Sequence, residues 1–349
     1  MALFPSHNTS GLSRIVTYLS FSLMTLLVGP WLIRNKPDVI YVYNLVTLSR
    51  TASFLRWLYG CKIVHDVQDL WPESVSSSGM LPMNGLLYKF FKKWCITSYQ
   101  RADCIAVLSP GFKKKLLHRG IAKQKIELIY NWTQEEKEPC EHKNNLSHIM
   151  RPVGQEQTFN VVFAGTMGIV QALETVLDAA EILLTEQNNA HFFLIGAGAK
   201  RQYLKEKSQK MRLANVTFMS RQPHSSMETI FQYSDVLLVH LKNDPLFKIT
   251  IPSKTQAYLA AGKPIIMAVE GDAADLVEQA GAGYSCRPED PRALADCVKN
   301  LVNMSSEERI ILGENGKKFY EREMSFVHGV DKFELIFKSV LKNDLSISE

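Results

Sequence analysis

The residues best suited to chemistry in this sequence are a hydroxyl and an ammonium group at the start of a short predicted helix. Within residues 251–271, Ser253 and Lys254 precede a helix-favouring segment that Gly262 ends, and an apolar run of strand length follows. Serine is a good N-cap, and the unpaired N–H groups at a helix N-terminus attract anions. An ordinary αβ unit of a parallel sheet has the same pattern, so this stretch alone favours neither packing nor phosphate binding.

Two glycine turns strengthen the case for an anion site. Residues 165–168 (GTMG) follow a predicted strand at 160–164, and residues 196–198 (GAG) follow one at 191–195. Each turn alone is weak evidence, because glycine after a strand is usually turn geometry. With Ser253 and Lys254 they give three anion-binding candidates on one edge of one sheet, where ligands of open α/β sheets bind. This conjunction favours a nucleotide diphosphate.

A second group of polar and aromatic residues follows a predicted strand at 61–65. A histidine beside carboxylates and an aromatic ring can orient a sugar and move protons. The alternative is structural: the histidine ends a strand, and Asp69 and Glu73 cap the next turn. The spacing leaves both open for the group, which is His65, Asp66, Gln68, Asp69, Trp71 and Glu73.

Several classes of protein are excluded by what the sequence lacks. It contains no GxSxG, HExxH, Walker A or complete GxGxxG motif. The six cysteines show neither paired nor metal-ligand spacing, which fits a reducing compartment. We therefore expect no metal site.

The elements that must position these residues alternate between strand and helix. The chain of 349 residues is long enough for two domains. The pattern predicts an α/β fold of two doubly wound units, residues 1–133 and 158–324, joined by a polar linker at 134–157, with a last helix in 325–349. Strands are predicted at 39–43, 61–65, 104–108, 126–130, 160–164, 191–195, 216–219, 236–241, 265–269 and 283–286.

Charge is divided unevenly along the chain. Residues 1–133 hold 16 Lys and Arg against 6 Asp and Glu, whereas the whole chain has a net charge of +5. This basic half can be a solvated surface or a contact with an anionic membrane; without a nucleic-acid-binding motif, DNA or RNA is the least favoured partner. The uncharged stretch 15–33 favours a buried or membrane-surface helix over a single membrane span.

Five strings of this sequence resemble the retaining glycosyltransferases of family 4, in the bacterial branch that transfers fucose- and N-acetylfucosamine-type sugars in surface polysaccharide assembly. The similarity runs over nearly the whole chain. It implies a GT-B fold of two Rossmann-like domains facing a cleft, no metal or other cofactor, and a last helix (325–349) that crosses back to the first domain. The strings are HDVQDLWPES (65–74), SPGF (109–112), YNW (130–132), IPSKTQAYLAAGKP (251–264) and VEGDAADL (269–276).

The resemblance also assigns roles to single residues. His65 matches the cleft histidine that contacts the transferred sugar, and Arg221 falls where the family contacts the base. With the neighbouring residues, this gives a catalytic set of His65, Asp66 and Lys254. The acceptor side would hold Asp69, Trp71 and Glu73. The donor-binding set is Gly165, Thr166, Gly168, Gly196, Gly198, Arg221, Ser253, Lys254 and Gln256.

The sequence departs from the family in three places. Two glutamates that many members carry correspond to Ile249 and Ala257 here. The Arg and Lys that members carry near the first glycine turn are replaced by Thr166 and Gln171, so Lys254 is the candidate replacement charge. The stretch that matches begins close to Met1, which predicts an incomplete N-terminal domain and an apolar edge strand at 39–43.

The resemblance predicts transfer of a sugar from a nucleotide-diphosphate donor to a lipid-linked saccharide, as in O-antigen, capsule or exopolysaccharide synthesis, with retention of configuration. The enzyme would lie in the cytoplasm at the anionic inner face of the inner membrane. One alternative is a catalytically inactive, shortened module that binds nucleotide or acts as a scaffold. A weaker alternative is a non-hydrolysing nucleotide-sugar epimerase.

Overall fold

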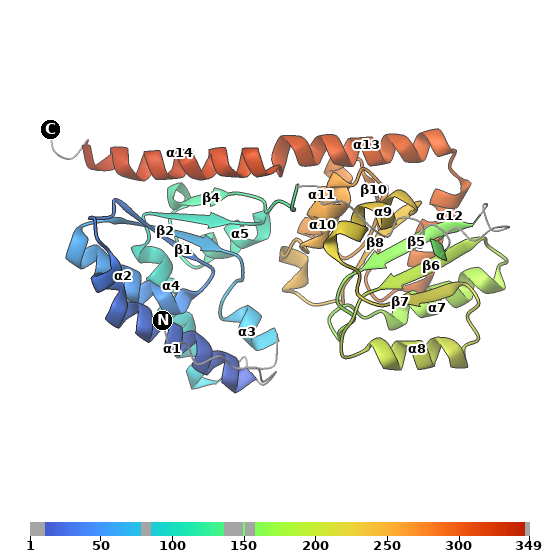
Figure 1. Cartoon of the computed structure of the whole chain (residues 1–349), viewed down its shortest axis with the longest axis horizontal. Helices are drawn as coiled ribbons and strands as arrows, with labels where there is room; N and C mark the ends of the chain where they lie inside the picture. The colour runs from blue at the N-terminus through green and yellow to red at the C-terminus, as the bar shows by residue number, and fades with distance from the viewer. Residues whose placement is uncertain (1–10, 78–84, 136–148, 151–157, 346–349) are drawn as a thin grey trace. The chain divides into compact units, whose positions relative to one another are not determined.

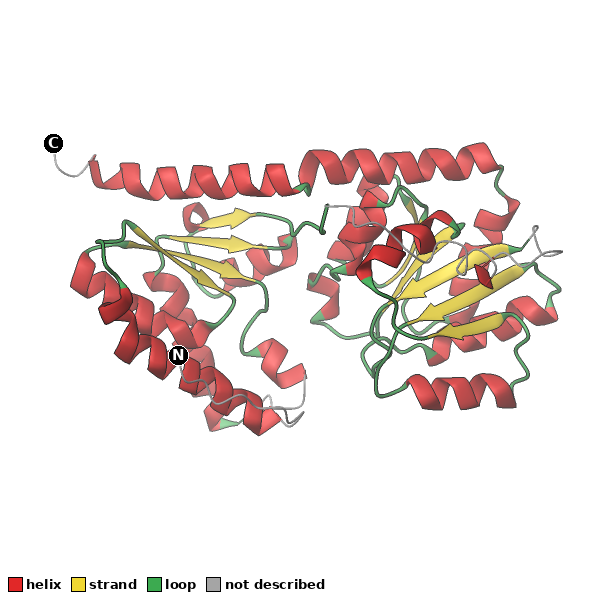
Figure 2. Cartoon of the chain, viewed as in Figure 1, coloured by secondary structure: helices red, strands yellow, loops and turns green. Residues whose placement is uncertain are grey.

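The computed structural model describes residues 11–77, 85–135, 149–150 and 158–345. It divides the chain into two compact units, residues 1–130 with 329–349, and residues 131–328. Figures 1 and 2 show that each unit is a sheet covered by helices. The predicted α/β class, with two parallel-sheet domains, is confirmed. Most of the predicted linker, residues 136–148 and 151–157, lies outside the described residues.

The first unit is built on a parallel sheet in the order β1-β2-β3-β4. As predicted, β1 is an edge strand among the described strands, and Tyr41 and Tyr43 in it are exposed. The expected shortening of this domain stays a prediction. The strands span Val39–Tyr43 (β1), Lys62–Val67 (β2), Cys104–Val107 (β3) and Ile126–Leu128 (β4).

Among the described residues, six α-helices belong wholly or mainly to the first unit. Of these, α1 and α2 lie side by side, because Thr51 of α2 donates to the Ser22 carbonyl and Tyr59 to the Pro30 carbonyl of α1, both at 3.2 Å. Among the described residues, no helix is both long enough and apolar enough for a bilayer span. The helices are Gly11–Leu32 (α1), Ser49–Tyr59 (α2), Glu73–Ser77 (α3), Leu86–Arg101 (α4), Pro110–His118 (α5) and Phe326–Leu345 (α14).

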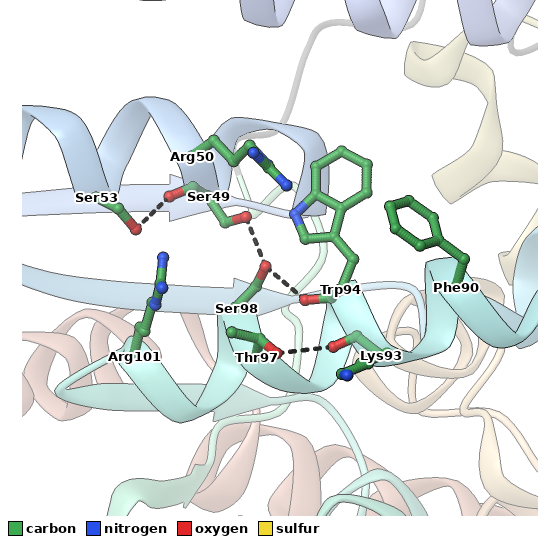
Figure 3. Close-up of a pocket in the computed structure, with 9 residues that line it drawn as sticks. All are labelled: Ser49, Arg50, Ser53, Phe90, Lys93, Trp94, Thr97, Ser98 and Arg101. Carbon is green, nitrogen blue, oxygen red and sulfur yellow. Dashed lines mark hydrogen bonds between the residues drawn. The ribbon is translucent and has the colours of Figure 1, made fainter.

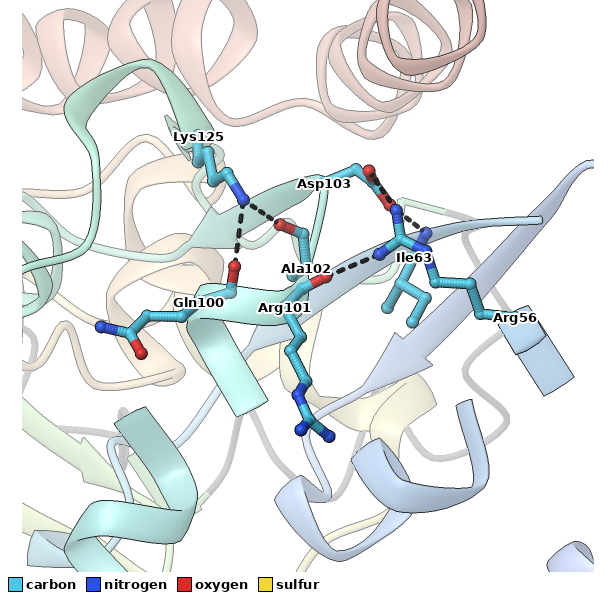
Figure 4. A network of polar contacts seen from close by, with 7 residues as sticks. All are labelled: Arg56, Ile63, Gln100, Arg101, Ala102, Asp103 and Lys125. Atoms are coloured by element: carbon cyan, nitrogen blue, oxygen red, sulfur yellow. Dashed lines mark hydrogen bonds and ion pairs between the residues drawn. The ribbon is translucent and has the colours of Figure 1, made fainter. Parts of the chain in front are cut away.

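Side chains close the carboxyl end of α4, where helix carbonyls lack partners within the helix. The Lys125 ammonium donates to the carbonyls of Gln100 and Ala102, at 3.0 and 2.8 Å, and Arg56 donates to the Arg101 carbonyl at 2.7 Å. Figure 4 shows that the same Arg56 also reaches Asp103, at 2.7 Å. Cations at a helix C-terminus are stabilising, so this network fixes α4 against the start of β3.

The last helix supplies part of the first unit's core. Ile336 and Val340 of α14 are buried against Val64 of β2 and Ala106 of β3. In addition, Phe333 packs edge-to-face on Tyr41, with 5.6 Å between ring centroids. One face of this sheet is therefore covered by residues that come some 200 positions later in the chain.

The second unit has a six-stranded parallel sheet in the order β10-β9-β8-β5-β6-β7. Its four inner strands are near-continuous apolar runs, because both faces of the sheet are covered by helices there. They span Phe159–Ala164 (β5), Ala190–Ile195 (β6), Val216–Met219 (β7), Val236–His240 (β8), Ile265–Ala268 (β9) and Gly283–Ser285 (β10).

The main core of this unit lies between one face of the sheet and two helices, α7 and α12. Leu177 of α7 and Val298 of α12 are fully buried against Val161 and Leu238 of the sheet. The capping box of Ser305 and Glu308 starts α13. The helices are Glu174–Thr185 (α7), Arg201–Lys210 (α8), Met227–Gln232 (α9), Lys254–Ala260 (α10), Asp272–Ala280 (α11), Pro291–Asn303 (α12) and Ser306–Glu323 (α13).

Candidate active site

The second sheet has a topological switch point between β5 and β8. From β5 the chain builds outward through β6 and β7, whereas β8, β9 and β10 lie on the other side of β5. All these strands are parallel, so their carboxyl ends meet at one edge. Open α/β sheets bind ligands in the crevice outside this edge, at the switch point.

Lys254 reaches this switch point from the first turn of α10. Its Nζ atom lies 3.6 Å from the centroid of the Phe163 ring, in β5. A Cβ placed on Gly165, directly after β5, would lie 3.0 Å from the same nitrogen. The fold therefore brings Lys254 and the first glycine turn together, although they are 89 positions apart in the sequence.

The Lys254 ammonium nitrogen is buried and has no hydrogen-bond acceptor among the described residues. Burial lowers its pKa to about 7. The Phe163 ring attracts a cation, but it replaces neither the water nor the anion that an ammonium group prefers. A buried donor without an acceptor is costly, and a bound anion would relieve that cost.

The two glycine turns pack against each other through their backbones. A Cβ on Gly196 would lie 1.9 Å from the Gly165 carbonyl oxygen, and one on Gly198 would lie 2.4 Å from that of Met167. Both glycines also have positive φ, 144° and 153°. Their role in the structure is thus to let the two turns touch, which the sequence does not distinguish from contact with a phosphate.

Most N–H groups of the first turn are already used. Gly165 and Met167 donate to carbonyls at the end of β6 and in the second turn, at 2.9 and 2.8 Å. Gly168 donates to the Gln171 side chain at 3.0 Å. Of the four N–H groups at 165–168, only that of Thr166 has no hydrogen bond to a described residue. Thr166 is exposed, so its N–H is the one in this turn most open to a ligand.

The start of α10 differs from the prediction. Ser253 was expected to cap the helix, but its backbone is already helical (φ −57°, ψ −22°) and its side chain makes no capping hydrogen bond. Gln256 is buried, and its amide nitrogen, oriented as a donor, lies 3.1 and 2.6 Å from the carbonyl oxygens of Pro252 and Ser253. The exposed Ser253 hydroxyl stays open to a ligand, while Gln256 is engaged within its own turn.

Two buried residues that our sequence analysis missed brace this region. The Tyr258 hydroxyl accepts from the Ala164 N–H at 3.0 Å and donates to the Ala164 carbonyl at 3.3 Å, which ties α10 to the end of β5. His240, at the end of β8, lies with Nδ1 2.7 Å from the Gln171 carbonyl, and its Nε2 accepts from the Glu289 N–H at 3.4 Å. Tyr258 lies four positions after Lys254, so helical spacing alone could have placed both on one face.

Arg221 follows β7 on the same edge of the sheet and is exposed. It lies two strands away from β5, across β6. The edge therefore carries two cationic side chains of the predicted donor set, one buried at the switch point and one toward the outer strand.

In the first unit, His65 lies inside β2 and is buried. The prediction that this strand ends at His65 is wrong, because β2 continues to Val67, which pairs with Val107 of β3. The His65 ring packs edge-on against Tyr99, with 6.0 Å between centroids. Burial lowers the pKa of His65 to about 4, so its imidazole is neutral at physiological pH.

Asp66 is also part of β2 and is held by two neighbours. The Tyr41 hydroxyl donates to its carboxylate, and so does the Gln68 amide, at 2.7 Å. Burial nevertheless raises the pKa of Asp66, because desolvation outweighs these two hydrogen bonds. Successive side chains of a strand point to opposite faces of the sheet, so Asp66 and His65 do not face each other: Asp66 contacts Tyr41, and His65 contacts Tyr99.

The three predicted acceptor-side residues differ in how open they are. Asp69 is exposed and exchanges two hydrogen bonds with Asn44, at 2.8 and 2.9 Å. Trp71 is buried, and its carbonyl accepts from Arg119 at 2.9 Å. The same Arg119 pairs with the Glu73 carboxylate, and its own side chain is only 4% exposed. The structure thus gives Trp71 and Glu73 partners inside the unit and leaves Asp69 at the surface.

The described residues contain no group of three or more His, Cys, Asp or Glu side chains arranged to hold a metal ion. The expectation of a metal-independent reaction stays a prediction.

Two family models match this chain in succession. Residues 11–137 match the model described as Glycosyltransferase Family 4, and residues 149–319 match glycosyl transferases group 1. Together with the two parallel-sheet units, these matches define a glycosyltransferase with the GT-B architecture. The chain is a glycosyltransferase of the group 1/family 4 type.

Curated relatives and solved structures agree with this class. The chain is 26% identical to the probable glycosyltransferase WbjE of Pseudomonas aeruginosa over 80% of its length and 71% of WbjE. It is 21% identical to the putative colanic acid biosynthesis glycosyl transferase WcaI of Escherichia coli K12, over 77% of the chain and 67% of WcaI. Its fold matches that of HepE of Anabaena, solved in complex with UDP, with a TM-score of 0.70 at 15% identity, over 95% of this chain and 85% of HepE.

Proposed function

We propose that this protein transfers a sugar from a nucleotide-diphosphate donor to a lipid-linked saccharide acceptor in surface polysaccharide synthesis, with retention of configuration. The observation that carries the donor half of this proposal is the buried, unpartnered Lys254 ammonium at the switch point of the second sheet. The relative WcaI is described as a putative colanic acid biosynthesis glycosyl transferase, which supports the polysaccharide context.

The donor diphosphate would lie against Lys254, the Thr166 N–H and the Ser253 hydroxyl. Departure of the nucleoside diphosphate places negative charge on its terminal phosphate. A positive charge fixed in a water-poor site stabilises such charge more than one exposed to solvent does. HepE was solved with UDP, so UDP is the first nucleotide to test. Arg221 would contact the base.

His65 and Asp66 would act on the sugar side of the reaction. A neutral imidazole at physiological pH can accept a hydrogen bond from a sugar hydroxyl without first losing a proton. The exposed Asp69 would contact the acceptor. The basic character of residues 1–133 would hold the enzyme at the anionic membrane surface where a lipid-linked acceptor lies.

Calorimetry with UDP, paired with a transfer assay that uses nucleotide sugars and membrane extracts, tests the proposal. We expect binding of UDP, release of UDP only when acceptor is present, and loss of both in Lys254→Met. UDP binding without transfer under any donor would support the inactive module instead. Conversion of the donor sugar without any acceptor would support the epimerase. A product with inverted configuration would contradict retention.

A further inference from the structure

The first unit carries a cationic pocket that the proposed reaction does not use. It lies between α2 and α4, has a volume of about 380 Å³, and is shown in Figure 3. None of the described residues that line it carries a carboxylate. The lining residues are Ser49, Arg50, Ser53, Phe90, Lys93, Trp94, Thr97, Ser98 and Arg101.

The hydroxyl groups of this pocket are occupied within the protein. Ser49 and Ser98 pair with each other at 2.7 Å, and Ser53 and Thr97 donate to carbonyls one turn earlier in their own helices, at 2.8 and 3.0 Å. The Ser49–Ser98 contact joins α2 to α4, and the other two hydrogen bonds hold their hydroxyl groups against their own helices. They leave ligand binding to the cationic and aromatic side chains.

The groups left over are hydrogen-bond donors to which the described residues offer no acceptor. The side chains of Arg50, Lys93 and Arg101 form no ion pair with a described carboxylate. The Trp94 indole N–H is buried and has no acceptor among the described residues. Arg50 lies over the Trp94 ring, 5.5 Å from its centroid, and Figure 3 shows the indole nitrogen on the side of the ring toward Arg50 and Ser49. Three cations and an unsatisfied N–H around one cavity suit a phosphate group.

The same unit also exposes apolar side chains on α1 and α2. A stripe with helical spacing on α1 is exposed, formed by Leu19, Leu23, Leu27 and Trp31 with exposed fractions of 49%, 55%, 58% and 88%. On the adjacent α2, Trp57 is 78% exposed and lies beside Phe54. Apolar side chains in this number on one helical layer mark a surface that contacts another molecule or a membrane.

The charge of these helices distinguishes a membrane from a second copy of the protein as the contact partner. The segments of α1, α2 and α4 contain no Asp or Glu at all, and they contain seven Arg and Lys. A helical surface that combines exposed tryptophan and leucine with basic residues and lacks acids is complementary to an anionic bilayer. Two copies of such a surface would repel each other, which disfavours a homodimer through this face.

We propose that the pocket between α2 and α4 binds the phosphate of an anionic phospholipid headgroup, while the apolar side chains of α1 and α2 enter the bilayer interface. This inference rests on the proposed function, which places the acceptor at a membrane, and it identifies the site of membrane contact. Arg50 and Arg101 hold the phosphate with the Trp94 N–H. The pocket therefore gives the surface a preference for phosphate beyond that of its net charge.

Co-sedimentation with phosphatidylcholine vesicles, with and without phosphatidylglycerol, tests the pocket in the full chain. Arg50→Gln/Arg101→Gln should weaken partition onto the anionic vesicles about 30-fold, since each near-surface cation contributes about fivefold. The control Lys205→Gln/Lys210→Gln removes two exposed cations from α8 of the second unit and should change partition less than about twofold. Equal losses in the two variants would overturn the proposal. Trp94→Phe, which keeps an aromatic ring and removes the N–H, should weaken partition while the protein stays folded, as its thermal unfolding transition shows.

Two further experiments distinguish a lipid phosphate from free inorganic phosphate, and membrane binding from dimerisation. If inorganic phosphate binds the pocket in calorimetry and displaces the protein from vesicles, the site takes a soluble ion, and the lipid assignment is wrong. A protein that dimerises and ignores vesicles would also contradict it. UDP binding, measured on every variant, should stay unchanged. Loss of vesicle partition with intact UDP binding therefore reports on this face alone, whereas absence of UDP binding in the unaltered protein counts against the proposed function.

Discussion

The Nζ atom of Lys254 lies over the ring of Phe163, 3.6 Å from its centroid, at the switch point of the second sheet between β5 and β8. The ammonium group is buried there without an acceptor among the described residues. This group lowers the stability of the folded protein, because removing a charge from water is costly unless a partner replaces the water. The donor diphosphate is the partner that we propose.

Replacing this lysine should separate stability from binding. Lys254→Met keeps the apolar stem over Phe163 and removes the unpaired charge. We expect a thermal unfolding temperature that is unchanged or higher, with UDP affinity reduced at least tenfold, which is a loss of about 1.4 kcal/mol or more. Differential scanning calorimetry and binding calorimetry on the same samples measure both. A variant that unfolds earlier and binds UDP normally would refute the role of this residue.

Binding of the donor should be linked to proton uptake. Burial lowers the pKa of Lys254 to about 7, below its usual 10.5, so above pH 7 the free protein holds this group largely neutral. A diphosphate favours the charged form and would raise the pKa again, so UDP affinity should fall as pH rises above 7. Calorimetry at pH 8 in two buffers of different ionisation enthalpy should report uptake of close to one proton. Equal apparent enthalpies in the two buffers would contradict this linkage.

The same pKa predicts how stability changes with pH. Between about pH 7 and pH 10.5 the unfolded chain binds the Lys254 proton and the folded chain does not, so the free energy of unfolding gains a rising contribution across this window. Lys254→Met should lack this rise. Urea titrations at pH 7 and pH 9 on both proteins give the comparison, and a parallel change in the two would show that other groups dominate.

The glycines of the second turn should be structural. In Gly196→Ala the new Cβ would meet the Gly165 carbonyl oxygen at 1.9 Å, so the turns must move apart, and we expect a loss of 2 kcal/mol or more, on the order of the larger single-site effects. Gly120→Ala is a matched control, since Gly120 also has positive φ (79°) but has nothing within 4 Å of the new atom. It should cost about 1 kcal/mol, the strain of the backbone alone. Similar losses in both variants would show that the contact between the turns is unimportant.

The contacts of this glycine turn could not be predicted from the sequence, although the strands around it could. The alternation of apolar runs and turns predicted every described strand to within two residues at each end, because a buried parallel strand has to be apolar along its whole length. The same pattern does not reveal what a glycine touches, so close packing and phosphate contact look alike at Gly196. Nor does it reveal the partners of Lys254, because Phe163 lies 91 positions away in the sequence.

Local rules also failed at two positions, one through a contact within a helical turn and one through pairing with a neighbouring strand. Ser253 has the residue type of an N-cap, yet its backbone is helical and the neighbouring Gln256 fills the first turn. The strand at His65 was predicted two residues too short, because pairing with β3 extends it through Asp66 to Val67. Polar residues in a strand end an apolar run in the sequence, but a neighbouring strand can still hold them in register.

The pairing of Glu73 with Arg119 should be structural. Arg119 is almost fully buried, so Glu73→Ala leaves an uncompensated charge, and we expect a loss of about 3–5 kcal/mol. Changing both residues, as in Glu73→Leu/Arg119→Met, should restore much of that stability. Chemical unfolding of the single and double variants measures the difference. If Glu73→Ala is stable but loses only transfer activity, Glu73 contacts the acceptor instead.

The buried His65 should make the protein sensitive to acid. Its folded-state pKa of about 4 lies below the usual 6.5, so the unfolded chain binds more protons between these values. The free energy of unfolding should therefore fall by up to about 3 kcal/mol as pH decreases from 6.5 to 4. His65→Phe should remove this part of the acid sensitivity, whereas His118→Gln, which alters an exposed histidine of α5, should not. Urea titrations at pH 7 and pH 5 provide the test.

The cover that α14 gives to the first sheet has a consequence for biosynthesis. A ribosome makes the strands β1 to β4 early, but Ile336 and Val340, which bury Val64 and Ala106, emerge about 200 residues later. During that interval the second unit is completed while one face of the first sheet still lacks its cover. The first unit to be synthesised is thus the last to finish folding. We therefore expect nascent chains that end before residue 333 to depend on chaperones.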